Sequence, residues 1–167
     1  KIKTKLALVN ILGIRRMGFD ASAKNVVQSG AVAEKLARGA ELGANYQGFG
    51  GVHQFNVSYI EAEDASTGKQ LGRRAKNHIS YQFDTTLAKA DLYAEIQYKG
   101  KRYDYLFGGT VVKLDSYSLV NLGVSYPVSD NIKLQAKVNN VFDENYQTSS
   151  AYFTQERVAY FGITYQN

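Results

Sequence analysis

Cysteine and tryptophan are absent from this 167-residue chain, and proline occurs once. The lack of cysteine excludes disulfides and thiolate metal sites, and it is compatible with export. Long apolar runs are absent too, because no segment approaches the roughly 18 residues that a membrane-spanning helix needs. The one aliphatic cluster, residues 6–14, is interpreted as a strand rather than a secretory signal, because Arg15 and Arg16 interrupt the signal pattern.

The charge of the chain is spread out rather than gathered on one segment. The formal net charge is +5, and the basic residues cluster only at 73–76 and 99–102. A nucleic-acid-binding module is expected to concentrate its cations on one face, so this class is excluded. The two histidines, His53 and His78, are too few for a metal triad. No catalytic triad spacing or phosphate-binding glycine loop occurs, so neither enzyme activity, nor a metal site, nor a cofactor is expected.

Apolar and polar residues alternate with period two along most of the chain, which is typical of β-strands with one face of each kind. His53, Phe55, Val57 and Tyr59, for example, share one face. Similar alternation recurs around residues 40–47, 78–83, 92–99, 120–126, 132–139 and 159–166, and less regularly at 2–11. The pattern predicts about eight antiparallel strands.

Two features favour a transmembrane barrel over a soluble sandwich. The connections between the expected strands alternate between long and short, and the apolar faces often end in an aromatic residue such as Tyr46, Phe83 or Tyr126. Membrane barrels have short periplasmic turns, long outer loops and aromatic girdles. The polar face carries Lys, Gln, Glu and Asn, which need water around them, so we expect an all-β, antiparallel transmembrane β-barrel portion from a barrel wider than eight strands.

Two segments resemble a known family. The stretch VNNVFD at residues 138–143, followed by Tyr146, Arg157 and a last alternating strand, resembles the C-terminal end of TonB-dependent outer-membrane receptors. ARGAEL at residues 37–42 resembles an earlier strand of the same receptors. The resemblance implies that residues 36–167 are C-terminal strands of a 22-stranded barrel, and that residues 1–35 hold an uncertain first strand and a long outer loop.

Within this family the segments at 71–76 (LGRRAK), 101–104 (KRYD), 118–128 (SLVNLGVSYPV) and 138–152 are most similar to the cobalamin receptors. The resemblance implies active uptake of a bulky metal chelate, cobalamin, across the outer membrane of a Gram-negative bacterium, with a siderophore as the alternative cargo. It also implies coupling to TonB through a plug domain that is not part of this sequence, and a terminal aromatic where this chain has Asn167. A self-contained eight-stranded barrel with an adhesin or structural role is the alternative from another class.

The long outer loops hold the candidate binding residues. Aromatic side chains beside charges on a glycine-containing loop can stack on a bulky ligand, which makes Tyr103, Tyr105, Phe107 and Tyr152 the expected ligand contacts. Basic residues at the outer leaflet suit the anionic groups of lipopolysaccharide. The expected lipopolysaccharide contacts are Lys69, Arg73, Arg74, Lys101 and Arg102.

Overall fold

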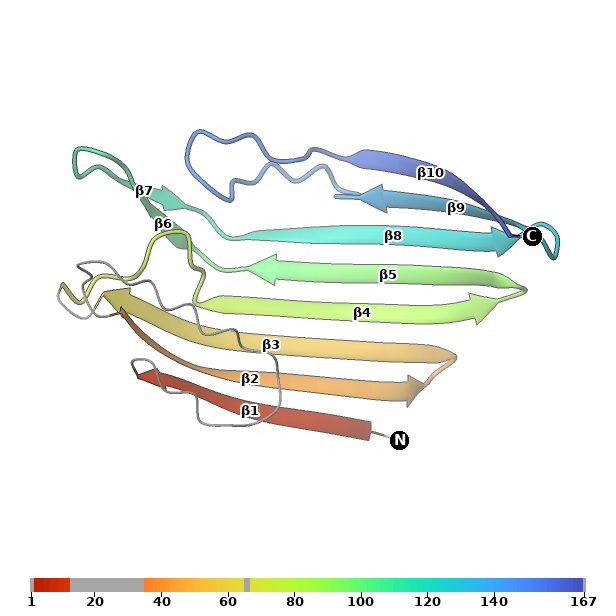
Figure 1. The fold of residues 1–167 in the computed structure, drawn as a ribbon, viewed down its shortest axis with the longest axis horizontal. Coiled ribbons are helices and arrows are strands. Elements are labelled where there is room, and N and C mark those ends of the chain that lie inside the picture. Colours follow the sequence, from red (N-terminus) through yellow and green to blue (C-terminus); the bar gives the residue numbers. More distant parts are fainter. Residues whose placement is uncertain (1, 13–34, 65–66, 167) are drawn as a thin grey trace.

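The computed structural model describes residues 2–12, 35–64 and 67–166, with side-chain surroundings for 37–64 and 67–166. Eight strands form one antiparallel sheet, and each strand lies beside its neighbours in the chain, apart from a small hairpin inserted after the fifth (Figure 1). The sheet strands are β1 (Ile2–Leu12), β2 (Lys35–Gly48), β3 (Gly51–Asp64), β4 (Asn77–Leu87), β5 (Ala90–Lys99), β8 (Tyr117–Pro127), β9 (Ile132–Asn139) and β10 (Val158–Tyr165). The expected eight strands and their order are confirmed. The long loop expected at 13–34 lies outside the described residues.

The pairing register confirms that apolar and polar residues occupy opposite faces of the sheet. Phe55 pairs with Ala44 on one side and Tyr81 on the other, whereas its neighbour Gln54 pairs with Asn45 and with a glutamine of β4. The same separation continues to the C-terminal edge, where Phe161 pairs with Ala136. We call these two sides the apolar face and the polar face. They arise because successive side chains of a strand point to opposite sides.

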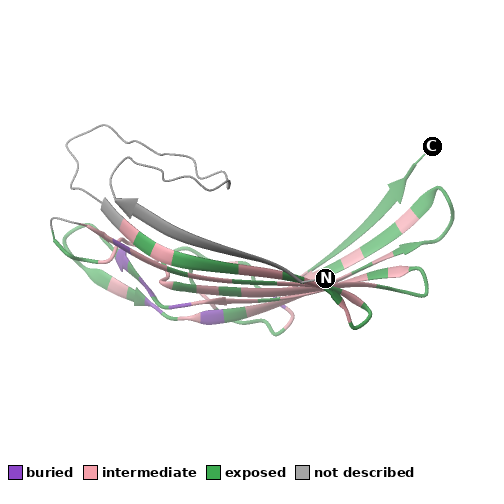
Figure 2. Ribbon diagram, turned by 90° about the horizontal axis from the view of Figure 1, so that it is seen from below, coloured by how far each residue is buried: buried purple, intermediate pink, exposed green. Residues whose placement is uncertain are grey.

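No residue of the described ranges forms a second layer over the apolar face. Only three hydrophobic residues among those described are buried, namely Ala62, Leu114 and Tyr117. On the apolar face Leu122 is 44% exposed and Phe161 is 85% exposed. A soluble sandwich buries such rows between two sheets, so that architecture is excluded. Seen along its edge, the sheet is a single curved layer, and its few buried residues gather at the long-loop end (Figure 2).

The sheet is open rather than closed. In the described part of the chain β1 pairs only with β2, and β10 pairs only with β9. A self-contained eight-stranded barrel requires pairing between the first and last strands, so this alternative is not what the structure forms. The chain instead has the form expected of one sector of a larger barrel, which is confirmed.

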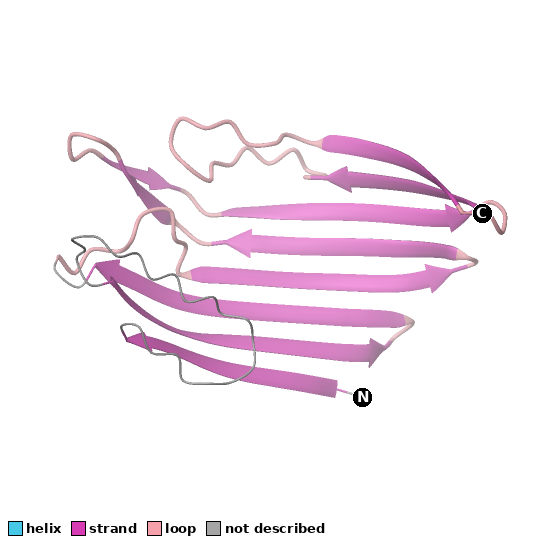
Figure 3. Ribbon diagram, viewed as in Figure 1, coloured by secondary structure: helices cyan, strands magenta, loops and turns pink. Residues whose placement is uncertain are grey.

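The short connections all lie at one end of the sheet and the long loops at the other (Figure 3). The turn between β2 and β3 has positive φ at Phe49 and Gly50, and the next short turn has positive φ at Ala88 and Lys89. Positive φ at both central residues is the geometry of hairpin turns whose twist matches that of the strands. Within the described ranges no helix has the length and apolarity needed to cross a membrane.

One feature differs from the sequence expectation. The connection expected to be a long loop after residue 100 contains a two-stranded hairpin of β6 (Arg102–Tyr105) and β7 (Val111–Leu114). Gly108 and Gly109, both with positive φ, lie at its tip. The glycine pair between two short alternating runs is a hairpin signal, but each run is only four residues long. The hairpin projects beyond the long-loop end of the sheet (Figure 1).

Two neighbouring residues of β3 can test which face of the sheet meets lipid. Phe55→Arg places a charge on the apolar face of β3, and Asn56→Arg places the same charge on the polar face. A charge facing lipid near the middle of a strand destabilises a membrane barrel by about 2–4 kcal/mol, whereas a charge in a wet lumen does not. We expect only Phe55→Arg to lower the guanidinium midpoint of the complete protein in lipid vesicles, followed by β-sheet circular dichroism. Equal effects of the two variants would contradict the assignment of the faces.

Candidate functional site

Three long loops meet above the long-loop end of the sheet. They are residues 67–76 after β3, the β6–β7 hairpin, and residues 140–157 before β10. The backbone N–H of Arg73 in the first loop donates to the carbonyl of Tyr103 in the hairpin at 2.7 Å. These segments are more than 25 residues apart in sequence, so their contacts give the loop end a tertiary structure that the alternation of strands does not predict.

Asp104 is the main junction between the three loops. Its carboxylate is 2% exposed and pairs with the Arg73 guanidinium, with 2.8 Å between Nε and Oδ1. The other carboxylate oxygen accepts hydrogen bonds from the Ser149 hydroxyl at 3.0 Å and the Ser150 backbone N–H at 2.7 Å. The Arg73 guanidinium first, and then the Ser150 N–H, hold the pKa of Asp104 below its ordinary value. One side chain therefore links all three loops.

Arg102 forms a second junction beside it. This residue is 3% exposed, donates to the Gln147 carbonyl, and donates more weakly to the Gly100 carbonyl at 3.4 Å. Its guanidinium carbon lies 4.9 Å from the centre of the Tyr117 ring, a cation–π contact. The Tyr117 ring in turn packs against Tyr146 of the last loop, with 4.5 Å between ring centroids. Arg102 thus attaches the hairpin to the N-terminal end of β8.

The last loop begins with a turn organised by Asn140, which is buried. The Asn140 side chain accepts from the Glu144 N–H at 2.8 Å and donates to the Glu144 carbonyl at 2.9 Å. Its backbone N–H donates to the Asn121 side chain at 3.0 Å. Across the loop the Arg157 N–H donates to Asp143 at 2.8 Å. Asn140 thus caps the turn through both groups of its side-chain amide.

The expected ligand aromatics lie on two of these loops. Tyr103 and Tyr105 are partly exposed on β6, and Phe107 is fully exposed at the hairpin tip. Tyr152 belongs to the last loop, is 67% exposed, and lies close enough to Arg73 to help raise the pKa of that guanidinium, after the larger effect of Asp104. The structure therefore presents these side chains at the same end of the sheet. Their contact with a ligand stays a prediction.

The expected lipopolysaccharide contacts do not all have the same surroundings. Lys69, Arg74 and Lys101 are exposed, and Arg73 is half-exposed although it is paired with Asp104. Arg102 differs, because its guanidinium is buried against Tyr117. Lipopolysaccharide contact stays a prediction for the whole set.

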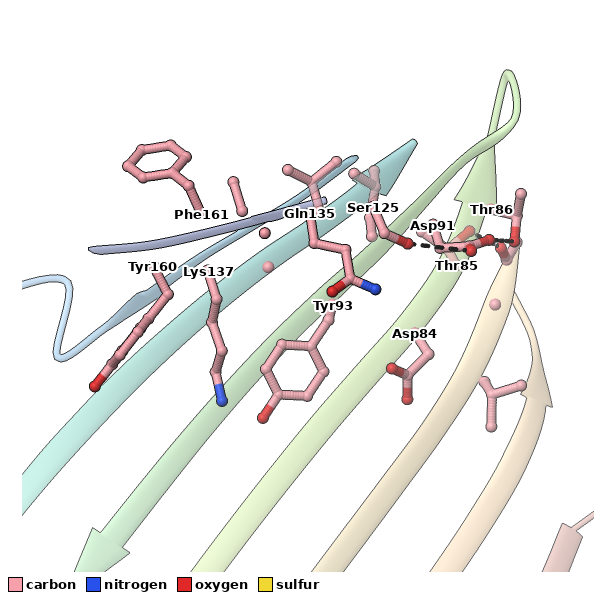
Figure 4. Close-up of a pocket in the computed structure, with 18 of the residues that line it drawn as sticks. Asp84, Thr85, Thr86, Asp91, Tyr93, Ser125, Gln135, Lys137, Tyr160 and Phe161 are labelled. Atoms are coloured by element: carbon pink, nitrogen blue, oxygen red, sulfur yellow. Dashed lines mark hydrogen bonds between the residues drawn. The ribbon is translucent and has the colours of Figure 1, made fainter. Parts of the chain in front are cut away.

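The polar face carries a second candidate surface that the sequence analysis did not single out. A hollow of about 1300 Å³ lies over this face towards the short turns, lined by residues of β2, β3, β4, β5, β8, β9 and β10. Figure 4 shows Asp84, Tyr93 and Lys137 projecting from the same side of the sheet, whereas Phe161 projects to the opposite side. The Lys137 ammonium lies 5.7 Å from the centre of the Tyr93 ring.

Charged groups in and beside this hollow form hydrogen bonds across strands of the polar face. Asp91 accepts from the Thr86 hydroxyl at 2.9 Å and pairs with Lys133 at 3.0 Å. Further along β5, the Glu95 carboxylate accepts from the Tyr93 hydroxyl at 2.7 Å and from Asn121 at 2.9 Å. Polar side chains joined across strands form a hydrophilic wall, as the lumen of a barrel requires. The period-two pattern was the signal that marked this face.

The two histidines lie on opposite faces of the sheet. His53 lies on β3 near the short turn, 2.7 Å from the Tyr81 hydroxyl through Nδ1 and 3.1 Å from the Gly48 carbonyl through Nε2. The carbonyl can only accept, so Nε2 carries the proton and Nδ1 accepts from the tyrosine. His78 lies on the polar face, since it pairs with Ser58. Among residues 37–64 and 67–166 no group of three metal-binding side chains occurs.

The Asp104 junction generates a proteolysis test. Asp104→Asn removes the charge that holds Arg73 and weakens the acceptor for the two serines, so we expect the outer loops to open more often. Trypsin cleavage of the complete protein in membranes is expected to become roughly tenfold faster at the loop lysines and arginines, since proteolysis follows the open population. The control is Asp115→Asn, because Asp115 pairs with Lys113 on the surface and is 78% exposed. Equal cleavage of both variants would contradict the role of Asp104.

The depressed pKa of Asp104 also predicts acid sensitivity of the loop end. A carboxylate whose pKa is lowered in the folded state stabilises that state at pH values above its ordinary pKa of 3.8. This contribution is lost as the pH falls through the lower pKa of the folded state. Spin labels on Phe107→Cys and Tyr152→Cys should give a narrow distance distribution at pH 6 and a broad one well below pH 3.8. In the Asp104→Asn background the distribution should be broad at both pH values. A pH response that persists in that background would assign it to another group.

Comparison with known proteins agrees with this architecture. Residues 13–141 match the family described as "TonB dependent receptor-like, beta-barrel". The ferripyoverdine receptor of the outer membrane of Pseudomonas aeruginosa aligns with a TM-score of 0.72 at 21% identity, over 98% of this chain and 25% of its own. The siderophore receptor PirA from Acinetobacter baumannii aligns with a TM-score of 0.67 at 22% identity, over 79% and 22% respectively.

A third solved structure, the ferric yersiniabactin uptake receptor FyuA from Yersinia pestis, aligns with a TM-score of 0.63 at 15% identity, over 78% of this chain and 22% of its own. The chain thus spans no more than a quarter of the length of these receptors. At such identities the structural likeness shows the fold alone, whereas the family match extends over well over half of the chain. The chain belongs to the TonB-dependent receptor-like β-barrel family.

Proposed function

We propose that this chain is the C-terminal barrel sector of a receptor that takes up a bulky metal chelate through the outer membrane of a Gram-negative bacterium with energy supplied through TonB. The family and the outer-membrane receptors of similar fold support the location. The observation that carries the proposal is the open, single-layer sheet with an apolar face and a hydrogen-bonded polar face. This chain would supply barrel wall and outer loops, with residues 36–167 as the C-terminal strands and 1–35 as the first strand and its loop.

The role of this chain would be to bind and guide cargo, and no catalytic step is proposed for it. The exposed aromatics Tyr103, Tyr105, Phe107 and Tyr152 would contact the chelate at the mouth of the barrel. Aromatic side chains suit this task because they offer a large apolar area with a polar edge. Of the five basic residues expected at lipopolysaccharide, Lys69 and Lys101 would meet its phosphates on the outside of the loops. Arg73, Arg74 and Arg102 would take a smaller part in this contact, because they line a hollow below the loops.

Two cargoes remain candidates. The similarity of residues 71–76 and 118–128 to the cobalamin receptors supports cobalamin. The solved structures of similar fold support a ferric siderophore, since the receptors from Pseudomonas, Acinetobacter and Yersinia are named for such ligands. Both are bulky metal chelates, so the proposed transport mechanism is common to them. A plug domain in another part of the polypeptide would fill the lumen beside the polar face and connect to TonB.

Uptake by cells tests the proposal directly. A strain that lacks the complete gene is compared with the same strain carrying the gene on a plasmid. Both are supplied with radiolabelled cobalamin or with a panel of ⁵⁵Fe-labelled siderophores. We expect one cargo to require the gene, and its uptake to stop when a protonophore abolishes the inner-membrane proton gradient. The Phe107→Ala and Tyr152→Ala variants should lower the affinity for that cargo by roughly tenfold. Gene-independent uptake of every chelate would overturn the proposal.

A further inference from the structure

A smaller hollow lies at the opposite end of the polar face from the one in Figure 4, below the outer loops. Its volume is about 270 Å³, and its walls come from β3, β4, β5, β8 and the three linked loops. Four of its residues form one row across the strands, since Ser58 pairs with His78, His78 with Lys99, and Lys99 with Tyr117. The row belongs to the polar face, which in a barrel faces the lumen.

The lining of this hollow is basic. Its titratable side chains are those of Arg73, Arg74, His78, Lys99, Arg102 and Tyr117, and no aspartate or glutamate lines it among the described residues. Arg73 is paired with Asp104. Arg74 and Lys99, by contrast, have no ion pair within the part of the chain whose side chains are described. Arg74 and Lys99 therefore bring positive charge to the hollow that no carboxylate of the described chain neutralises by an ion pair, and this favours an anion from outside.

Two buried nitrogen atoms at this hollow have no hydrogen-bond partner among the residues that the structure describes. They are Nε2 of His78 and Nε of Arg102, and Arg102 as a whole is only 3% exposed. A buried polar group without a partner is unfavourable, and such groups in folded proteins usually meet a ligand, an ion or water. The Arg102 guanidinium is also held rigidly by Gln147 and the Tyr117 ring, so it does not need to be ordered when an acceptor binds.

We propose that this hollow, the outer basic pocket, binds an anionic oxygen group of the transported cargo, a carboxylate or a phosphate. This inference rests on the proposed function and narrows the cargo to chelates that carry such a group. The pocket is too small for a whole chelate, because pockets for drug-sized ligands begin at roughly 300 Å³. It fits a charged arm, while the bulk of the cargo remains above it near the exposed aromatics of the hairpin and last loop.

The position of the pocket indicates that the anion comes from the cargo and not from lipid. Lipopolysaccharide phosphates lie around the outside of a barrel, next to the apolar face, whereas the row of Ser58, His78 and Lys99 lies on the polar face. The charge along that face also changes with depth. Asp84 and Asp91 lie near the short turns together with Lys137, whereas no carboxylate among the described residues lines the pocket at the outer mouth. An anionic arm is therefore attracted at the mouth first.

Citrate, a small tricarboxylate, is the probe for the test. Its binding to the purified full-length receptor in detergent is measured by isothermal titration calorimetry, for the wild type and for the double variant Arg74→Gln/Lys99→Gln. We expect binding by the wild type that weakens with added salt, and an affinity at least tenfold lower in the double variant, as expected for lost charge-assisted hydrogen bonds. The control is Lys89→Gln/Lys113→Gln, which removes the same charge outside the pocket and should leave the affinity unchanged.

Three results of this experiment would contradict the proposed role of the outer basic pocket. Equal weakening in both double variants would overturn it, because the attraction would then be a property of the net charge. No binding by the wild type would also overturn it, since another part of the receptor would then fill the pocket. Competition between citrate and purified lipopolysaccharide would assign the pocket to lipid phosphate and not to cargo. Because Arg74 and Lys99 have no ion pairs in the described chain, thermal unfolding of the double variant should match that of the wild type and confirm that it folds.

Different results would contradict the proposed pocket and the proposed function. If gene-dependent, TonB-powered uptake of a chelate occurs but Arg74→Gln/Lys99→Gln leaves both citrate affinity and uptake unchanged, the pocket is wrong and the function stands. If citrate binds as expected but no chelate requires the gene for uptake, the function is wrong while the anion site remains.

Discussion

The structure depends on one constraint, which is that a backbone in lipid must form all its hydrogen bonds within the protein. Antiparallel strands meet this constraint along their length, and the pairing from β1 to β10 meets it for six of the eight strands on both sides. The two edge strands have their second partners elsewhere in a complete barrel. The same constraint explains why the sheet needs no covering layer, because lipid on one face and a wet lumen on the other replace the two halves of a soluble core.

The sheet could be predicted from the sequence because its cause is local. Alternation with period two depends only on which side chains face lipid, and it is visible in any stretch of five or six residues such as residues 53–59. The lengths of the connections are visible in the same way. The β6–β7 hairpin was not predicted, because four-residue strands are too short to show a clear period, and because the buried residues Arg102 and Asp104 look like solvent-exposed charges in sequence.

The loop end could not be predicted because its contacts join distant segments. Nothing in the sequence near Asp104 indicates that its carboxylate accepts from Ser149 and Ser150, which are more than 40 residues away. The basic pocket likewise needs the cross-strand register, which brings His78 beside Lys99 although they are far apart along the chain. The expected contact residues could be chosen by their loop and their chemistry. Which cations face outward and which face the lumen could be decided only from the fold.

The stretch at residues 138–143 favours the register of the last strand. Asn140 adopts a positive φ of 51° and closes a turn on Glu144, while Asp143, with a φ of 57°, receives the N–H of Arg157 one residue before β10 begins. These bonds hold the two ends of the loop next to the first pair of the ladder, Asn139 with Val158, and so favour the observed register of β9 and β10. A slip of one residue would turn Phe161 and Ile163 from the apolar face to the lumen and Tyr160 and Thr164 to lipid, because side chains alternate strictly along a strand. Polar residues of the loop thus support the arrangement of the apolar side chains in the strands beside it, which gives this polar stretch a physical reason.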